Sequence, residues 1–125
     1  MLDIEAQVAY WRGGAEEDWA VALELLQHRR ERHALFLAHL ALEKVLKAHV
    51  CRETRDLAPR IHNLVRLAQL SGMSIPDRTL DILAEMNAFS MEGRYPTLLP
   101  PPSPQEARGY MDRGGEVFRW LLSQL

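Results

Sequence analysis

Apolar side chains recur every three or four residues along most of the chain, which is the spacing of helices that bury one face. No run of alternating apolar and polar residues is long enough to predict a strand. The pattern predicts five helices, over residues 3–27, 30–52, 62–70, 77–91 and from 103 onward. Five helices with mostly short connections indicate an all-α fold: an antiparallel up-and-down four-helix bundle with an additional short helix.

The glycine pair Gly13-Gly14 lies inside the predicted first helix. Two glycines cost about 2 kcal/mol relative to two alanines in a helix interior, so a break at this point is one interpretation. The apolar stripe nevertheless keeps its phase across the pair, from Val8 to Trp19. We therefore expect one continuous helix.

The connection before the last helix is rich in proline. Residues 96–104 (PTLLPPPSP) hold five of the seven prolines, which predicts an extended loop because proline lacks the backbone N–H. Gly93 is expected to end the fourth helix. Ser103, Pro104 and Glu106 have the spacing of a capping box, which predicts the start of the fifth helix.

Length and composition indicate one soluble globular domain. The chain has 125 residues, of which 47% are hydrophobic, and we expect residues 1–125 to form a single domain. Cys51 is the only cysteine, which excludes an internal disulfide and a cysteine-based zinc site. The sequence starts without a signal-peptide pattern and has no run of about 20 apolar residues for a membrane span, so we expect a cytoplasmic protein without membrane contact.

The small net charge of −2 hides an uneven distribution. Residues 1–27 hold six acids and one base, whereas residues 28–66 hold nine bases and four acids. Thirteen of the fifteen bases are arginine, which favours bidentate contacts to carboxylate or phosphate. Two interpretations stay open: the basic segment neutralises the acidic one by packing against it, or it forms a surface for a polyanion.

His62 stands out among the five histidines because it follows a proline-containing loop at the start of the predicted third helix. Arg55 precedes it with six residues between them. An arginine that holds a phosphate and a histidine that moves a proton are the minimum for metal-free RNA cleavage, with Arg55 and His62 as the catalytic pair. The alternative is that His62 lies beside the helix N-cap and hydrogen-bonds locally.

Two further groups are candidates for binding a nucleotide. Arg94 and Tyr95 lie where the fourth helix gives way to the proline-rich loop, so that arginine can hold a phosphate and tyrosine can stack on a base. A structural turn is the competing interpretation. Glu43, Lys44 and Lys47 place charges inside the most apolar helix, facing either a polar groove, a neighbouring subunit or solvent.

These segments, taken in order, resemble a HEPN domain. The resemblance covers nearly the whole chain and depends on the combination rather than on any one segment. It rests on Trp11, Asp18, Ala22 and Leu26, then HALFLAHLALEKVLKA (His33–Ala48), HNL (His62–Leu64) and RYP (Arg94–Pro96).

The resemblance implies an antiparallel four-helix bundle with a shorter extra helix, usually dimeric. HEPN proteins are often paired with a minimal nucleotidyltransferase in toxin–antitoxin modules. Many are metal-independent ribonucleases whose site joins an arginine and a histidine across the dimer, and others bind nucleotides without cleaving. The residues that match the family pattern and are expected to line a shared nucleotide- or phosphate-binding groove are Glu43, Lys44, Lys47, His62, Arg94 and Tyr95.

One departure from the family pattern decides between these activities. The ribonucleases carry their Arg–His motif near the start of a late helix, and this chain has no histidine after His62. We therefore expect a homodimeric nucleotide- or partner-binding module that pairs with a nucleotidyltransferase and needs no metal or other cofactor. The alternative is a metal-independent endoribonuclease that uses Arg55 and His62, and a third is a purely structural helical subunit.

Overall fold

Five α-helices and one turn of 3-10 helix form the regular structure of residues 1–90 and 101–125, the part of the chain that the computed structural model describes. The helices are α1 (Ile4–Gln27), α2 (Glu31–Thr54), α3 (Leu64–Leu70), α4 (Asp77–Met86) and α5 (Pro104–Ser123), with the 3-10 turn η1 (Asn87–Phe89) after α4. The predicted all-α class is confirmed. None of the helices in these residues is long and apolar enough to cross a bilayer.

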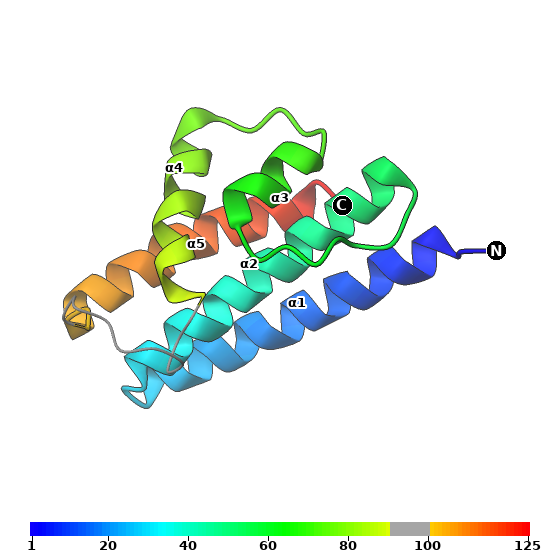
Figure 1. Cartoon of the computed structure of the whole chain (residues 1–125). Helices are drawn as coiled ribbons and strands as arrows, with labels where there is room; N and C mark the ends of the chain where they lie inside the picture. The colour runs from blue at the N-terminus through cyan, green and yellow to red at the C-terminus, as the bar shows by residue number, and fades with distance from the viewer. Residues whose placement is uncertain (91–100) are drawn as a thin grey trace.

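Helices α1 and α2 form a long antiparallel hairpin (Figure 1). The Asp3 side chain caps α1 by accepting a hydrogen bond from the backbone N–H of Ala6, at 3.1 Å. The helix runs through Gly13-Gly14 without a break, as expected. A Cβ atom at Gly14 would lie only 3.2 Å from Cδ of Lys44, so this glycine makes room for a lysine side chain of α2.

Helix α2 is the centre of the molecule, as its wide apolar face predicts. It packs against α1, α3, η1 and α5, and most of its residues from Ala34 to Cys51 are buried. A helix covered on several sides has little surface left for charged side chains. The polar residues that α2 nevertheless buries are therefore the first place to look for function.

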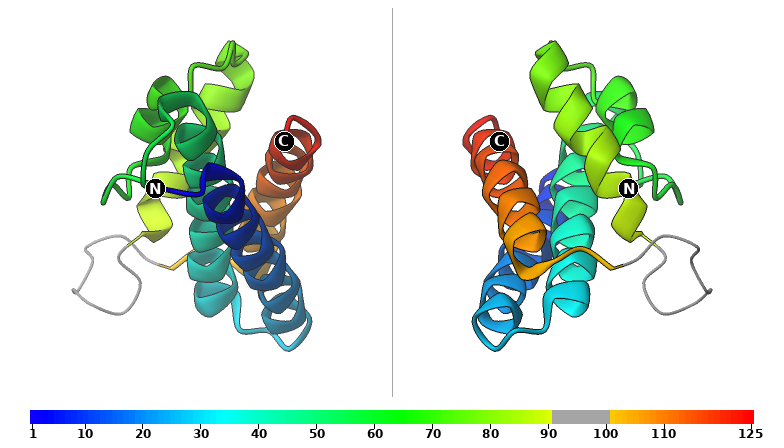
Figure 2. Two further views of the ribbon diagram at one scale, coloured as in Figure 1. Left: turned by 90° about the vertical axis from the view of Figure 1, so that its right-hand side faces the viewer. Right: turned by 90° about the vertical axis from the view of Figure 1, so that its left-hand side faces the viewer.

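Helix α5 runs in the same direction as α2, with α1 antiparallel to both (Figure 2). The ring of His49 donates from Nε2 to the carbonyl oxygen of Leu121 at 2.8 Å, and Nη1 of Arg52 donates to the carbonyl oxygen of Leu125, also at 2.8 Å. From the first bond to the second, the chain advances by three residues in α2 and by four residues at the end of α5. The two segments therefore run in the same direction and in a fixed register. Both bonds are made to backbone oxygens in the last turn of α5 or just beyond it.

The acidic first segment and the basic middle segment are joined by two ion pairs. Nζ of Lys44 lies 2.7 Å from Oδ2 of Asp18, and Nη2 of Arg52 lies 3.7 Å from Oε2 of Glu5. Packing leaves the majority of the basic residues of segment 28–66 on the surface, so it neutralises only part of that segment. The exposed ones are Arg29, Arg30, Arg32, Arg55, Arg60 and Arg66.

The ends of the two short helices differ in how well the sequence predicts them. Helix α3 begins at Leu64 with Asn63 as its N-cap, inside the predicted range of residues 62–70. The fourth helix is predicted to continue towards residue 91, but α4 ends at Met86 and the chain tightens into η1. At this junction a tertiary contact forms: Oδ1 of Asn87 accepts a hydrogen bond from the backbone N–H of Leu64 at 2.9 Å. The expected stop at Gly93 lies outside the described residues.

The start of α5 is as predicted. Oγ of Ser103 accepts from the backbone N–H of Glu106 at 3.1 Å, and the Glu106 carboxylate accepts from the backbone N–H of Ser103 at 2.9 Å. These bonds to Ser103 lower the pKa of Glu106.

Helices α1 and α5 meet through an aromatic stack over a glycine. The rings of Trp19 and Phe118 are stacked with centroids 5.0 Å apart, and a Cβ atom at Gly115 would lie 3.0 Å from Cζ2 of Trp19. No such neighbour lies within 4 Å of a Cβ atom at Gly13. A side chain at position 115 would therefore crowd Trp19, whereas position 13 has room for one.

We expect Gly115→Ala to lower the free energy of unfolding by roughly 1 kcal/mol or more, because overpacking against the indole outweighs the gain in helix propensity. Gly13→Ala is the matched control, and we expect it to raise the same quantity by about 0.5–1 kcal/mol. Urea unfolding followed by circular dichroism measures both. Equal stabilisation by the two substitutions would show that Trp19 does not need the space at Gly115.

Candidate functional site

A row of three polar side chains lies along the buried part of α2. His39, Glu43 and Lys47 are each four residues apart, so they share one face of the helix. All three are buried, and the side chains of Glu43 and Lys47 are only 8% and 7% exposed. Oε2 of Glu43 lies 2.9 Å from Nζ of Lys47, so the two charges compensate each other inside the helix packing.

His62 reaches the same carboxylate from the segment between α2 and α3. Its Nδ1 lies 3.1 Å from Oε1 of Glu43, so each oxygen of Glu43 has one partner. The bond requires Nδ1 to carry the proton, because a carboxylate only accepts. The His62 side chain is 74% exposed, and its Nε2 makes no hydrogen bond to a described residue. A buried carboxylate thus holds a surface imidazole in one orientation and one tautomer.

Helix α1 covers the Lys47 end of this row. The indole of Trp11 covers Lys47, whose Nζ lies 5.2 Å from the ring centroid. Trp11 and Trp19 are eight positions apart and so share a face of α1. Trp19 is buried there, whereas Trp11 is half-buried over the ammonium group.

His39 is the unusual member of the row. It is 1% exposed, and neither of its ring nitrogens has a hydrogen-bond partner among the described residues. Burial lowers the pKa of His39, and this effect is opposed by the charge of Glu43, the backbone of His62 and the side chain of Asn87. The structure shows a buried neutral imidazole beside the functional candidates.

Two asparagines fix the segment that carries His62. Oδ1 of Asn63 caps α3 by accepting from the backbone N–H of Arg66 at 3.0 Å, and it also accepts from Nδ2 of Asn87 at 3.2 Å. Asn87 in turn accepts from the backbone N–H of Leu64. The start of α3 is thus tied to the end of α4 one residue after His62. Apart from the capping preference of Asn63, no sequence pattern indicates this contact.

The other predicted site residues lie elsewhere or outside the described part of the chain. Lys44 pairs with Asp18 of α1 and does not join the row. Arg55 is the C-cap of α2 with φ 56°, and it lies twelve positions after Glu43, which corresponds to about 18 Å along the helix axis. The structure does not bring Arg55 and His62 together within one chain. Arg94 and Tyr95 fall in residues 91–100, outside the described residues.

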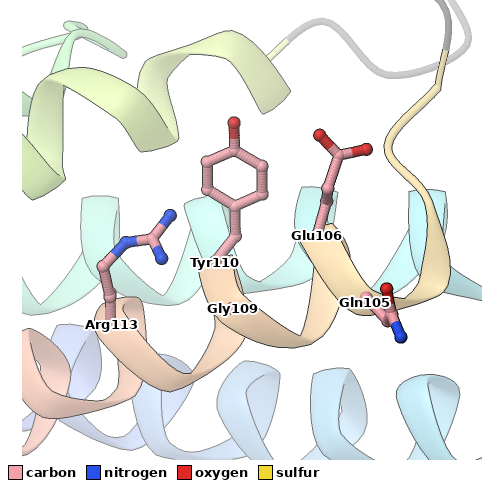
Figure 3. Close-up of a pocket in the computed structure, with 5 residues that line it drawn as sticks. All are labelled: Gln105, Glu106, Gly109, Tyr110 and Arg113. Carbon is pink, nitrogen blue, oxygen red and sulfur yellow. The ribbon is translucent and has the colours of Figure 1, made fainter.

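A shallow hollow of about 330 Å³ lies at the start of α5, away from these residues (Figure 3). Tyr110 projects towards the end of α4, where its ring makes an edge contact with Phe89. Nη2 of Arg113 pairs with Oε2 of Glu85 at 3.0 Å. Its charged group is therefore already paired, and the carboxylate of Glu106 is engaged in the capping box.

The family model of the HEPN domain matches residues 8–125, which is most of the chain. The chain belongs to the HEPN family. The resemblance found in the sequence is thereby confirmed.

Two solved structures have a similar fold. The crystal structure of TT1696 from Thermus thermophilus is 19% identical, covers 95% of this chain and 98% of its own, and has a TM-score of 0.78. The crystal structure of ST0689, an archaeal HEPN homologue, is 19% identical, covers 99% of this chain and 98% of its own, and has a TM-score of 0.71. At this identity the likeness concerns the fold alone. A search of curated proteins gave no match.

In this HEPN chain the candidate site is a polar cluster made by Glu43, Lys47, His62, His39 and Trp11. Glu43 and Lys47 are nearly enclosed by protein, and the carboxylate of Glu43 holds the ring of His62. No group of three His, Cys, Asp or Glu side chains in residues 1–90 and 101–125 is arranged to hold a metal ion. The chemistry that the cluster offers is an exposed imidazole that accepts at Nε2 when neutral and binds anions when protonated.

We expect Lys47→Met to lower the free energy of unfolding by about 3 kcal/mol, because it leaves the buried Glu43 carboxylate without its cation. The double variant with Glu43→Leu removes that carboxylate and regains most of the loss. Arg12→Met is the matched control, because it breaks the Arg12–Glu16 pair, whose side chains are 46% and 53% exposed. It changes the stability by about 0.5 kcal/mol or less. A Lys47→Met effect no larger than this control would contradict a buried charge pair.

The two buried histidines make the stability depend on pH. Burial lowers the pKa of both His39 and His49 in the folded chain, below the value of 6.5 that applies when it is unfolded. Below pH 6.5 the unfolded chain therefore binds more protons, and the free energy of unfolding decreases as the pH falls. Urea unfolding at about pH 7.5 and about pH 5.0 measures the decrease.

The same measurement on variants assigns the decrease to its source. His39→Gln removes one titrating group, so the variant loses less stability on acidification than the unaltered protein. His33→Gln is the control, because His33 is an exposed histidine of α2. The same pH dependence in all three proteins would exclude His39 as a contributor.

Proposed function

We propose that this HEPN protein is a nucleotide- and partner-binding module that pairs with a minimal nucleotidyltransferase, as in toxin–antitoxin modules, and acts as a homodimer. The observation that carries the proposal is the exposed His62 ring held by the buried Glu43 carboxylate. A side chain that is fixed on one edge and free on the other loses little entropy when it binds a ligand. The buried pair therefore prepares His62 for binding.

The charges around His62 favour an anionic ligand. Arg60 and Arg66 are exposed, close to His62 in the sequence, and form no ion pair with a described residue. Arginine binds phosphate through paired N–H groups, so these two side chains and His62 suit a nucleotide phosphate.

The remaining predicted binding residues have indirect or untested roles in this proposal. Lys44, Lys47 and Glu43 are engaged in internal pairs, so they act on the ligand only through the positions that they fix. Arg94 and Tyr95 stay predicted contacts to the nucleotide.

The surface of α1 supports association with another protein. Tyr10 and Val21 are eleven positions apart, so they share a face of this helix, and both are exposed, Tyr10 to 70%. They lie among the acidic residues of the first segment, which suits a partner surface that combines apolar and basic groups.

A second candidate function is metal-independent cleavage of RNA. The bond from Nδ1 of His62 to Glu43 favours it, because a carboxylate that holds Nδ1–H leaves Nε2 free as a base towards a 2′-hydroxyl. The positively charged group for the phosphate would then come from Arg55 of a second copy, since Arg55 of the same chain lies at the far end of α2. The family pattern of a site shared across a dimer fits this requirement.

We expect AMP to bind to the unaltered protein with saturation in isothermal titration calorimetry, and binding to weaken about tenfold or more in His62→Ala because a phosphate contact is lost. His33→Ala, at an exposed histidine elsewhere on α2, is expected to bind AMP unchanged. An unaltered affinity in His62→Ala would refute the proposed site.

The ribonuclease alternative is tested on the same three proteins with labelled RNA in EDTA. No cleavage by any of them is the result expected for a binding module. Cleavage by the unaltered protein and His33→Ala, but not by His62→Ala, would establish the nuclease instead.

A further inference from the structure

Two histidines lie beside one carboxylate. Glu43 holds the exposed His62 through Oε1, while the buried His39 lies one helical turn away on the same face of α2. The charge of Glu43 acts on the ring of His39, and the backbone of His62 and the side chain of Asn87 border it as well. His39 is thus placed where α2, the His62 segment and the α4–η1 junction meet.

Proton uptake changes what His39 requires. A neutral imidazole has one donor and one acceptor nitrogen, whereas the protonated ring has two donors and a positive charge. A buried charge of this kind has to be paired and hydrogen-bonded. The only negatively charged group that acts on it among the described residues is Glu43, whose two oxygens already accept one hydrogen bond each, from Lys47 and from His62.

We propose that His39 and His62 compete for Glu43, so that protonation of the buried His39 draws the carboxylate away and releases His62 together with the start of α3. Lys47 stays paired in both states, because its ammonium group is buried under Trp11 and needs the carboxylate. His62 is the partner that is lost, because its exposed ring regains its hydrogen bonds from water.

The groups around His39 are consistent with this exchange. On its own helix it faces the carboxylate of Glu43, with Lys47 one turn beyond. From the segment before α3 it meets His62, whose charge opposes a second positive charge on His39. From the α4–η1 junction it meets the uncharged amide of Asn87, which also holds the backbone N–H of Leu64. Protonated His39 therefore competes for both groups that anchor the start of α3.

The exchange would regulate the proposed ligand site, and this part of the inference rests on the proposed function. A nucleotide phosphate on His62 favours the state in which His62 stays on Glu43. By thermodynamic linkage, a bound phosphate therefore opposes proton uptake at His39. Protonation of His39 at lower pH in turn weakens binding of the ligand. A ligand that binds about tenfold more tightly when His62 is bonded to Glu43 shifts the midpoint of His62 release by about one pH unit.

The experiment is a pH titration from about 7.5 to about 5.0, followed by the backbone amide signals of residues 61–67 in NMR spectra. In the unaltered protein we expect a transition of these signals with a midpoint below 6.5, where His39 takes up its proton. His39→Leu abolishes this transition, and His39→Gln serves the same purpose should the leucine variant not fold. Saturating AMP shifts the midpoint of the unaltered protein to lower pH.

Two controls separate His39 from the other histidines. His62→Gln keeps a transition of residues 64–67, because His39 and Asn87 are unchanged. His49→Gln also keeps it, because His49 is bonded to Leu121 on the side of α2 that faces α5. No transition in the unaltered protein, or one that persists in both His39 variants, overturns the competition. A transition that depends on His39 but does not respond to AMP supports the competition and counts against the proposed nucleotide site.

Discussion

The constraint on which the site depends is the burial of the Glu43 carboxylate in the middle of the central helix. A carboxylate removed from water needs a cation and hydrogen bonds on both oxygens. Lys47 supplies the cation from the next turn of α2, and His62 supplies the second donor from a different segment. The position of the segment before α3 follows from this requirement as much as from apolar packing.

The same constraint changes the roles of the charged residues. Glu43 and Lys47 have the residue types that contact phosphates and nucleotides, yet both are nearly enclosed by protein. In the proposed function their effect on a ligand passes through His62, which is the exposed member of the cluster. Buried ion pairs of this kind are weak contributors to net stability, so a role in positioning explains their presence better than a role in folding.

Several features of the fold follow from local patterns and were predicted. The constant phase of the apolar stripe predicted that α1 continues through its glycine pair, and the capping box at Ser103 predicted the start of α5. The wide apolar face identified α2 as the central helix. The α-helix predicted to continue towards residue 91 instead ends at Met86 and passes into η1, where Asn87 gives its side chain to α3 and no pattern within residues 77–91 indicates that contact.

The sequence by itself determined the presence of five helices, the capping box of α5 and the HEPN family, because each depends on residues a few positions apart or on the order of motifs. The tertiary structure decided that His62 meets Glu43, that Arg55 lies far from both, and that His39 is buried without a partner among the described residues. These contacts join residues on different elements, or depend on what covers a helix face. Helical periodicity fixes which side chains share a face, but only packing determines what that face meets.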